Sequence, residues 1–469
     1  MPNLLHSPTL RAARAQAIYL LRGRTTGARI IRGTGGTFVL RLLNMALKFA
    51  SSLALARLLG PEEYGIFNFA QAWLLVLIVP AVAGFDRLLV RDLSIYLTQE
   101  AWAAMRGAIR FATRGALALS CAVAALSLLA AWLTYRLTGR PALLNADQAE
   151  VARAALVTLG VALLVLPLRA ILLVQQGAMR GLRQVVLSQV PDLVIQPGLF
   201  LLAVSVAYVG GRALQTANLA MLLFAGSTGA ALVAGAWALN RTTPPPLREA
   251  QPVFLPRLWL ASAVPFALSQ VLGTLNTQVD ALMLGALDSP TAVAYYTVTQ
   301  RLTMVITLPL LSVTVALAPH VASLHAAGRL GELQRAITSS TRLVVALSLP
   351  FTALFVVAGT FFLGLFGEEY RVAQTALAIF SLGQLVNAVT GPVIILLMMT
   401  GHERAATATT GAGVALHVLL NALLIPRWSI EGAAIAGGIS VAALNLAQAA
   451  LAWRWLRINS LPLGPTVYR

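Results

Sequence analysis

Four polar side chains recur at intervals of i, i+3, i+7 and i+10 in the first long apolar stretch, which places them on one face of a helix. They are Arg41, Asn44, Lys48 and Ser51. Basic groups bind phosphate and other anions through charge-assisted hydrogen bonds. A charge in the middle of a bilayer costs roughly 2.5–3.5 kcal/mol on insertion scales, so this face should line a cavity or meet a partner. The spacing therefore predicts an anion-attracting cavity along this helix.

A second polar face occurs in the second half of the chain. A shift of 229 residues carries the first face onto Gln270, Gly273, Thr277 and Asp280, and the next apolar stretch adds Gln300 and Arg301. At about 1.5 Å per residue, Arg41 is expected in the cytoplasmic third of the membrane, Lys48 near its middle and Arg301 in its outer third. These positions predict a ladder of positive charge between two halves of the molecule.

Acidic groups inside the apolar stretches have alternative roles. Asp280 is expected near the depth of Arg301, so it is a candidate either for an ion pair or for uptake of a coupling proton. Asp86 lies at the end of the second apolar stretch. It is a candidate gate residue or, with equal weight, an ordinary solvated residue at the start of a cytoplasmic helix. Arg169 and Asp192 are expected at one depth, which favours a structural ion pair. The intramembrane acids are too few to neutralise all of the basic groups, which favours a function for Arg41, Lys48 and Arg301.

The composition restricts the class of protein that can contain these residues. The 469 residues are 58% hydrophobic and 11% charged, whereas a soluble domain carries about 25% charged residues. This excludes a soluble enzyme, a disordered tail and a disulfide scaffold. The lone lysine, Lys48, follows Leu47 rather than glycine, so no nucleotide-binding P-loop is expected. One cysteine, Cys121, and five histidines without metal-site spacing predict no metal and no resident cofactor.

Twelve apolar stretches are each long enough to cross a bilayer. The predicted fold is therefore an all-α polytopic membrane protein of about twelve transmembrane helices. The expected spans are 35–57, 65–86, 112–135, 154–176, 185–209, 215–239, 258–284, 293–319, 343–366, 373–400, 405–426 and 432–453.

The distribution of basic residues predicts the orientation in the membrane. With the amino terminus inside, 23 of the 34 basic residues fall in cytoplasmic segments, 7 in outer loops and 4 within spans, where Arg57 and Arg114 near span ends are counted with the adjoining loops. Cytoplasmic loops of membrane proteins are enriched in Lys and Arg, so both termini are expected in the cytoplasm and the protein in the cell (inner) membrane. This bias accounts for most of the net charge of +18 without a nucleic-acid partner.

The chain divides at a proline-rich segment. Residues 241–257 contain five prolines and three arginines, and three consecutive prolines exclude a continuous helix. The predicted organisation is a basic cytoplasmic arm (1–34), a six-helix lobe (35–240), a cytoplasmic linker (241–257), a second six-helix lobe (258–456) and a cytoplasmic tail (457–469).

The two predicted lobes share sequence features at one offset. Pro61 matches Pro290, and Gln71 matches Gln300, in both cases at a shift of 229 residues. Because each lobe has six spans, both lobes start on the same side of the membrane. The repeat therefore predicts lobes related by a pseudo-two-fold axis along the membrane normal, an arrangement found in transporters.

Two stretches of the sequence resemble a known family. LALARLLGPEEYGIFNFAQA (Leu53–Ala72) is similar to the amino-terminal signature of polysaccharide-transport flippases. The segment Leu420–Pro426, followed by Glu431–Ala434, resembles their carboxy-terminal motif. The resemblance extends over roughly residues 30–456 in span number and loop pattern. The family is the O-antigen (Wzx-type) branch of the multidrug/oligosaccharidyl-lipid/polysaccharide exporter superfamily.

The resemblance implies two lobes in a V shape and a flippase that moves a polyprenyl-pyrophosphate-linked oligosaccharide between leaflets by alternating access. Its expected partners are that glycan, membrane lipids and polysaccharide assembly proteins. The head group would enter near Arg41 and Lys48 and move towards Arg301. Transport would be driven by H+ or Na+ coupling, by the membrane potential or by downstream consumption. A multidrug or other lipid exporter and a membrane glycosyltransferase or polymerase are alternatives. A drug exporter should favour acidic cavity residues, and an enzyme should have an acidic motif or a large outer loop.

Overall fold

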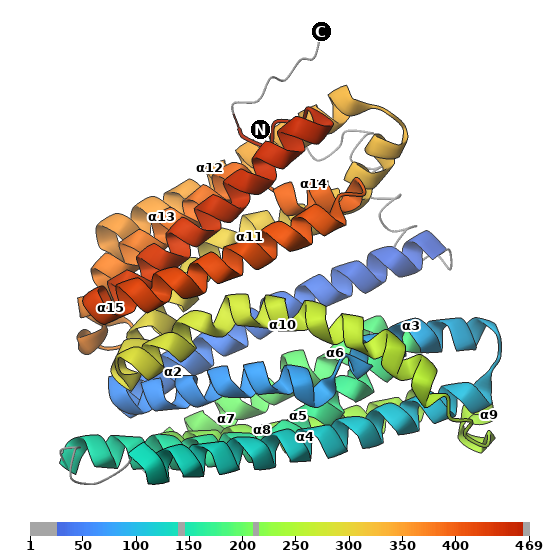
Figure 1. The fold of residues 1–469 in the computed structure, drawn as a ribbon, viewed down its shortest axis with the longest axis horizontal. Helices are drawn as coiled ribbons and strands as arrows, with labels where there is room; N and C mark the ends of the chain where they lie inside the picture. Colours follow the sequence, from blue (N-terminus) through green and yellow to red (C-terminus); the bar gives the residue numbers. More distant parts are fainter. Residues whose placement is uncertain (1–25, 139–145, 210–214, 463–469) are drawn as a thin grey trace, which may run out of the picture.

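The structure is a computed structural model that describes residues 26–138, 146–209 and 215–462, so residues 1–25 of the predicted arm lie outside it. The described residues form helices and contain no strand. Most of the helices are long, and those of the second lobe, such as α12 (Leu330–Gly364) and α15 (Glu403–Leu456), are inclined to those of the first, so the two groups diverge towards one end (Figure 1). Helices are the structure expected where water cannot satisfy backbone groups, because each helix satisfies its own.

The first lobe contains the helices before the linker. These are α2 (Thr26–Val82), α3 (Phe85–Thr98), α4 (Trp102–Thr138), α5 (Ala146–Gly181), α6 (Val185–Val190), the π-helical turn η2 (Pro191–Ile195), α7 (Gln196–Val209) and α8 (Ala217–Thr242). Helix α2 starts nine residues before the predicted span at 35 and continues through Gly33–Gly36. The glycines of this stretch are therefore part of a helix and form no turn.

The remaining helices form the connection and the second lobe. These are α9 (Pro245–Glu249), α10 (Pro256–Leu287), α11 (Pro290–Ala326), α12 (Leu330–Gly364), the 3-10 helix η3 (Glu368–Ala373), α13 (Gln374–Thr390), α14 (Val393–Met399) and α15 (Glu403–Leu456). The short helix α9 starts within the three consecutive prolines, where proline is tolerated because the first turn needs no backbone donor.

The number of membrane crossings agrees with the sequence. In the described part of the chain, nine helices are long and apolar enough to span a membrane, and α10 is a tenth that bends by 50° between Pro256–Leu268 and Gly273–Leu287. Helices α2 and α15 are each interrupted by non-helical backbone, at Gly60 and at Trp428–Ser429. Each of these two therefore crosses twice, which confirms the prediction of about twelve transmembrane helices in two lobes.

At one end of the molecule, here called the Gly60 end, the lobes share an apolar core. The Phe49 and Phe366 ring centroids lie 5.6 Å apart, and those of Tyr64 and Tyr370 lie 6.5 Å apart. The backbone of α2 approaches that of α11 so closely that a Cβ on Gly65 would lie 1.8 Å from the Pro290 carbonyl oxygen. Buried side chains of both lobes thus form one continuous cluster that closes this end.

At the opposite end, here called the α3 end, the first part of α10 packs on the first lobe. Trp259 is fully buried among side chains of α3 and α4, and its indole Nε1 donates to the Tyr96 hydroxyl at 3.2 Å. The Val253 backbone N–H donates to the Ala103 carbonyl at 3.0 Å. Residues that the sequence places in the linker and at the start of the second lobe are therefore held by the first lobe.

Candidate functional site

The largest of three neighbouring cavities, of 420 Å³, lies between α2, the α5–η2 region and α11. We call it the amphipathic cavity, because its walls differ in polarity. The polar wall carries basic groups from α2, α5 and α11, a single carboxylate, and several uncharged polar groups. Its members are Arg41, Asn44, Lys48, Gln176, Arg180, Gln189, Asp192, Arg301 and Ser312.

The apolar wall of the amphipathic cavity is formed mainly by α2 and α11, the helices that also carry Arg41, Lys48 and Arg301. Several of its side chains, including Leu42 and Leu311, are more than 40% exposed. Large apolar side chains of a membrane helix that face neither protein nor polar groups are suited to contact hydrocarbon. The wall consists of Phe38, Leu42, Met45, Phe49, Leu193, Met304, Leu308, Leu311 and Val315.

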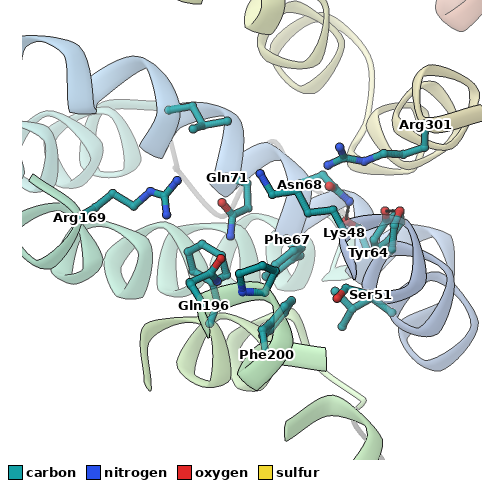
Figure 2. Close-up of a pocket in the computed structure, with 15 residues that line it drawn as sticks. Lys48, Ser51, Tyr64, Phe67, Asn68, Gln71, Arg169, Gln196, Phe200 and Arg301 are labelled. Atoms are coloured by element: carbon teal, nitrogen blue, oxygen red, sulfur yellow. Dashed lines mark hydrogen bonds between the residues drawn. The ribbon is translucent and has the colours of Figure 1, made fainter. Parts of the chain in front are cut away.

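A second cavity, of 140 Å³, adjoins the first at Lys48 and Arg301, which line both. We call it the amide cavity after the side chains of Asn68, Gln71 and Gln196 in its wall. Figure 2 shows the Lys48 side chain extending across its centre, with the Arg169 and Arg301 guanidinium groups directed inwards from opposite sides. Its aromatic base is formed by Phe67, Phe200 and Phe224, which contact one another, and Tyr64 is a further aromatic side chain of its wall.

A third cavity, of 280 Å³, lies in the second lobe and also reaches Arg301. We call it the second-lobe cavity. It is lined mainly by uncharged polar side chains of α10, α11 and α13, namely Thr277, Gln278, Gln300, Thr303, Thr307 and Gln384. Thr277 and Gln300, which the sequence predicted as cavity residues, lie here, whereas Gln270 lies outside the walls of all three cavities. Arg301 is the side chain that these three cavities share.

The basic groups predicted to form a ladder, Arg41, Lys48 and Arg301, all line the amphipathic cavity. Lys48 precedes Gly60 by twelve residues and Arg301 follows Pro290 by eleven, and the helical turns after these two positions pack together through Gly65 and Pro290. Lys48 and Arg301 thus lie near the same end of the two lobes and share two cavities. The position of Arg301 in the outer third of the membrane stays a prediction.

Three of the clustered cations have no ionic partner among the described residues. Arg41, Lys48 and Arg301 form no salt bridge there, and the buried Arg301 Nε has no hydrogen-bond partner. Arg180, which the sequence analysis assigned to a cytoplasmic loop, is a fifth basic group of the linked cavities and donates to Gln176 Oε1 at 2.8 Å. Unpaired guanidinium and ammonium groups facing a cavity are suited to bind an anion.

Arg169 and Asp192 form a direct pair, with Arg169 Nη1 2.8 Å from Asp192 Oδ1. The π-helical turn that begins at Pro191 contains this aspartate, and π-turns of this kind are frequent at functional sites. Asn44 Nδ2 donates to the Leu193 carbonyl in the same turn at 2.9 Å. Asn44 therefore ties α2 to η2 as well as lining the cavity, and the structural role of the pair stays a prediction.

Asp280 does not pair with Arg301 but lies in a buried cluster of the second lobe. Its Oδ2 accepts from the Tyr296 hydroxyl and its Oδ1 from Asn421 Nδ2, both at 2.7 Å, and His417 Nε2 lies 2.7 Å from Oδ1. All four side chains are more than 90% buried. The cluster joins α10, α11 and α15, so Asp280 is separated from the three cavities and bound within its own lobe.

Asp86 lies at the start of α3, close to α5. A Cβ on Gly177 would lie 2.4 Å from the Asp86 carbonyl oxygen, and Asp86 Oδ1 is buried without a hydrogen-bond partner. Asp86 lines none of the three cavities. Within the described residues, no three His, Cys, Asp or Glu side chains are grouped as metal ligands would be.

Several residues of the site were missed in the sequence because they carry no charge. The amide cavity depends on Phe67, Asn68 and Gln71 from α2, and on Gln196 and Phe200 from α7. Asn68 and Gln71 are three residues apart and face the same side as Tyr64 and Phe67, a helical pattern of polar and aromatic residues that could have indicated them. Nothing in the α7 sequence distinguishes Gln196 from an ordinary buried amide.

The comparisons with known proteins agree with this architecture. The family model described as polysaccharide biosynthesis protein matches residues 30–325, which is more than half of the chain. The MatE model matches residues 265–423. No curated protein matches the chain.

Solved structures with the same fold are transporters of one superfamily. The inward-facing conformation of a multidrug resistance MATE family transporter of the MOP superfamily is 15% identical, with a TM-score of 0.71 over 88% of this chain and 94% of that one. The lipid II flippase MurJ in its inward closed conformation is 14% identical, with a TM-score of 0.67 over 90% of this chain and 87% of that one. A MOP superfamily transporter from Pyrococcus furiosus, whose binding pocket is described as having reverse polarity, is 15% identical with a TM-score of 0.61 over 94% and 97%.

Proposed function

Because the chain belongs to the polysaccharide biosynthesis protein family, we propose that it is a flippase for a polyprenyl-pyrophosphate-linked oligosaccharide. It moves this lipid across the cytoplasmic membrane for the assembly of a surface polysaccharide such as O-antigen. In this proposal the protein acts as a transporter rather than an enzyme, and its partners are the lipid-linked glycan, membrane lipids and polysaccharide assembly proteins.

The amphipathic cavity is the observation that carries this proposal. Its lining combines the unpaired cations Arg41, Lys48 and Arg301 with large apolar side chains of the same helices, several of which are partly exposed. A pyrophosphate with an attached hydrocarbon chain has these two properties joined in one molecule. Charge-assisted hydrogen bonds would hold the phosphates, while the chain would lie along α2 and α11 and extend into the lipid.

We propose that both termini are cytoplasmic, since 23 of the 34 basic residues then fall in cytoplasmic segments. In that orientation the α3 end faces the cytoplasm, and the apolar core at the Gly60 end closes the path to the outside. The state described is then an inward-facing one. Rocking of the lobes would open the Gly60 end and expose the Lys48–Arg301 region to the outer leaflet.

Transport in this proposal is driven by an ion gradient, by the membrane potential or by downstream consumption of the product. Coupling to a H+ or Na+ gradient would need a carboxylate that changes its charge or its ligand during the cycle. Asp280, which joins three helices of the second lobe, is the first candidate. Asp86, which lies where α3 begins against α5, is the second.

Multidrug export is a second candidate function, and the match of the MatE model to residues 265–423 favours it. The cavity chemistry opposes it for cationic drugs. Five basic groups and one carboxylate line the amphipathic and amide cavities together, and like charges repel at short range in a medium of low dielectric constant. A drug carried by this site would therefore be anionic or neutral.

The proposal is tested by removing the unpaired cations one at a time. Arg41→Ala, Lys48→Ala and Arg301→Ala are each expected to reduce transbilayer movement of a fluorescent polyprenyl pyrophosphate in proteoliposomes by about 10- to 100-fold, since a hydrogen bond to a charged group contributes about 1.5–3 kcal/mol. Arg335→Ala is the matched control, because Arg335 is exposed in α12 and lines none of the three cavities. Wild-type rates in all three variants, with normal amounts of protein, would contradict the proposal.

A further inference from the structure

The amide cavity presents hydrogen-bond acceptors directly beside the cation cluster. Asn68 Nδ2 donates to the Tyr64 carbonyl at 2.7 Å, and the Ser51 hydroxyl donates to the Leu47 carbonyl at 2.8 Å. One N–H of Asn68 and the Ser51 proton are thus engaged by backbone oxygens of α2. The Asn68 Oδ1 and Ser51 Oγ lone pairs are left for a ligand in the cavity.

Gln196 likewise uses an amide N–H in a bond to the protein, and its oxygen has no hydrogen-bond partner among the described residues. Its Nε2 donates to Ser227 Oγ at 3.3 Å, and Ser227 itself donates to the Phe224 carbonyl at 2.8 Å. Because the serine proton is already used, the serine oxygen must act as acceptor, and this fixes the nitrogen of Gln196 on the protein side. Gln71 Nε2 lies 4.0 Å from Met221 Sδ in a similar orientation. No described residue donates to Oε1 of either glutamine.

The cavity therefore combines donors with acceptors within a few side chains. Lys48, Arg169 and Arg301 offer only N–H groups, whereas Ser51, Asn68, Gln71 and Gln196 each add an oxygen acceptor, and each amide keeps a second N–H. Figure 2 shows Gln71 and Gln196 on the side of Lys48 towards Arg169, and Asn68 on its other side, towards Arg301. A matching ligand carries anionic oxygens next to hydroxyl or amide N–H groups. A phosphate joined to a sugar has this order of groups, and a bare lipid phosphate lacks the hydroxyl groups.

The size of the amide cavity limits the ligand further. Its 140 Å³ is well below the roughly 300–1,000 Å³ of ordinary small-molecule sites. This space is suited to one ring and not to an oligosaccharide. The aromatic base formed by Phe67, Phe200 and Phe224 gives an apolar surface for the C–H face of such a ring.

From these observations we propose that the amide cavity is the subsite for the sugar ring attached to the pyrophosphate, and that Ser51, Asn68, Gln71 and Gln196 determine which sugar is accepted. This inference rests on the proposed function. Lys48 and Arg301 line both the amide cavity and the amphipathic cavity. A pyrophosphate held between them therefore has its lipid on one side and its first sugar on the other.

Binding measurements on the purified full-length protein in detergent test this subsite with three probes. These are farnesyl pyrophosphate and the same lipid carrying either one glucose or one N-acetylglucosamine on its terminal phosphate. For wild type, at least one glycosylated probe is expected to bind more tightly than farnesyl pyrophosphate. Asn68→Leu and Ser51→Ala should each weaken that probe by about 3- to 10-fold, the effect of losing a neutral hydrogen bond. The affinity for farnesyl pyrophosphate should change by less than about twofold.

Two further variants separate the possible outcomes. Ser205→Ala is the matched control, because Ser205 is exposed in α7, lines none of the three cavities and, like Ser51, donates to the carbonyl four residues before it; it should leave all three affinities unchanged. Lys48→Ala should weaken all three probes equally. If wild type binds every probe with the same affinity, or if Asn68→Leu and Ser51→Ala weaken all probes alike, the sugar subsite is wrong while the flippase function stands. If wild type binds no probe at all, the proposed function fails, and the subsite fails with it.

Discussion

At the residue scale, the ion pair between Arg169 and Asp192 allows a test in which the charges are exchanged. Both side chains are more than 80% buried, and removing one partner of a buried pair costs about 3–5 kcal/mol because the other charge is left uncompensated. Arg169→Asp and Asp192→Arg are each expected to lower the unfolding temperature and the transport rate. The double variant should recover most of both. Thermal unfolding in detergent, together with transport, measures this.

The exchange also distinguishes a structural pair from a substrate contact. If Arg169 holds the substrate rather than Asp192, the double variant regains thermal stability but not transport. If neither thermal stability nor transport returns in the double variant, the two residues do not act as an ion pair, despite their 2.8 Å contact. The equivalent exchange of Arg329 and Glu332 is the control, because this pair is exposed and exposed pairs contribute only about 0–1 kcal/mol.

Asp280 provides a second prediction at this scale, for coupling. Asp280→Asn keeps an oxygen for the Tyr296 hydroxyl but can neither take up a proton nor neutralise Na+. Its transport should therefore no longer respond to an imposed H+ or Na+ gradient, while binding of farnesyl pyrophosphate is retained. Transport in proteoliposomes with and without each gradient measures this. Asp288→Asn is the control, since Asp288 is an exposed acid at the end of the same helix. A wild-type response to the gradients in Asp280→Asn would move the coupling role to Asp86.

The sequence indicated charged residues of the site better than neutral ones. Arg41, Lys48 and Arg301 were predicted because a charge inside an apolar stretch needs an explanation, and all three line the amphipathic cavity. Asn68 and Gln196 have no such signal, since a neutral amide in a membrane helix is compatible with ordinary helix packing. Whether they contact a ligand depends on which helices meet, and that is a property of the tertiary structure.

At the element scale, Gly65 controls the contact between α2 and α11. A side chain there would overlap the Pro290 backbone, which cannot move without shifting the start of α11. Gly65→Ala is therefore expected to open the Gly60 end, increasing the accessibility of Tyr370 and lowering thermal stability. Limited proteolysis and cysteine labelling near Leu365 measure the opening. Gly229→Ala in α8 is the control, because its Cβ would meet nothing within 4 Å and alanine is favoured over glycine in a helix by about 1 kcal/mol. An unchanged Gly60 end in Gly65→Ala would mean that the neighbouring backbone adjusts.

The sequence predicted the helices well and their ends less well. Hydropathy placed all twelve crossings, because a bilayer imposes one length and one polarity on each of them. It could not predict that α4 continues from Trp102 before the apolar stretch begins at 112, since the polar end of a helix has no hydropathy signal. It also could not predict that the first part of α10 packs on the first lobe. That position depends on a cavity for Trp259 formed by side chains of α3 and α4.

At the scale of the whole molecule, the two ends differ in how the lobes are held. The Gly60 end has an apolar core contributed by both lobes, and Arg57 Nε donates across it to the Leu365 carbonyl at 2.6 Å. The unpaired cations lie on the α3 side of this core. A rocking mechanism requires the core to separate during each cycle, so its contacts must be weaker than the packing within each lobe.

A reversible cross-link at the Gly60 end tests whether this separation occurs. Arg57→Cys and Leu365→Cys, combined with Cys121→Ser to remove the exposed native cysteine, place two thiols across the boundary between the lobes. Oxidation to a disulfide is expected to reduce transport to background while leaving the affinity for farnesyl pyrophosphate within about twofold, because the cavity on the α3 side remains accessible. Reduction of the same sample should restore transport, and this internal control separates locking from damage. Full transport by the oxidised protein would show that the substrate crosses without opening of the Gly60 end, and alternating access by rocking lobes would have to be abandoned.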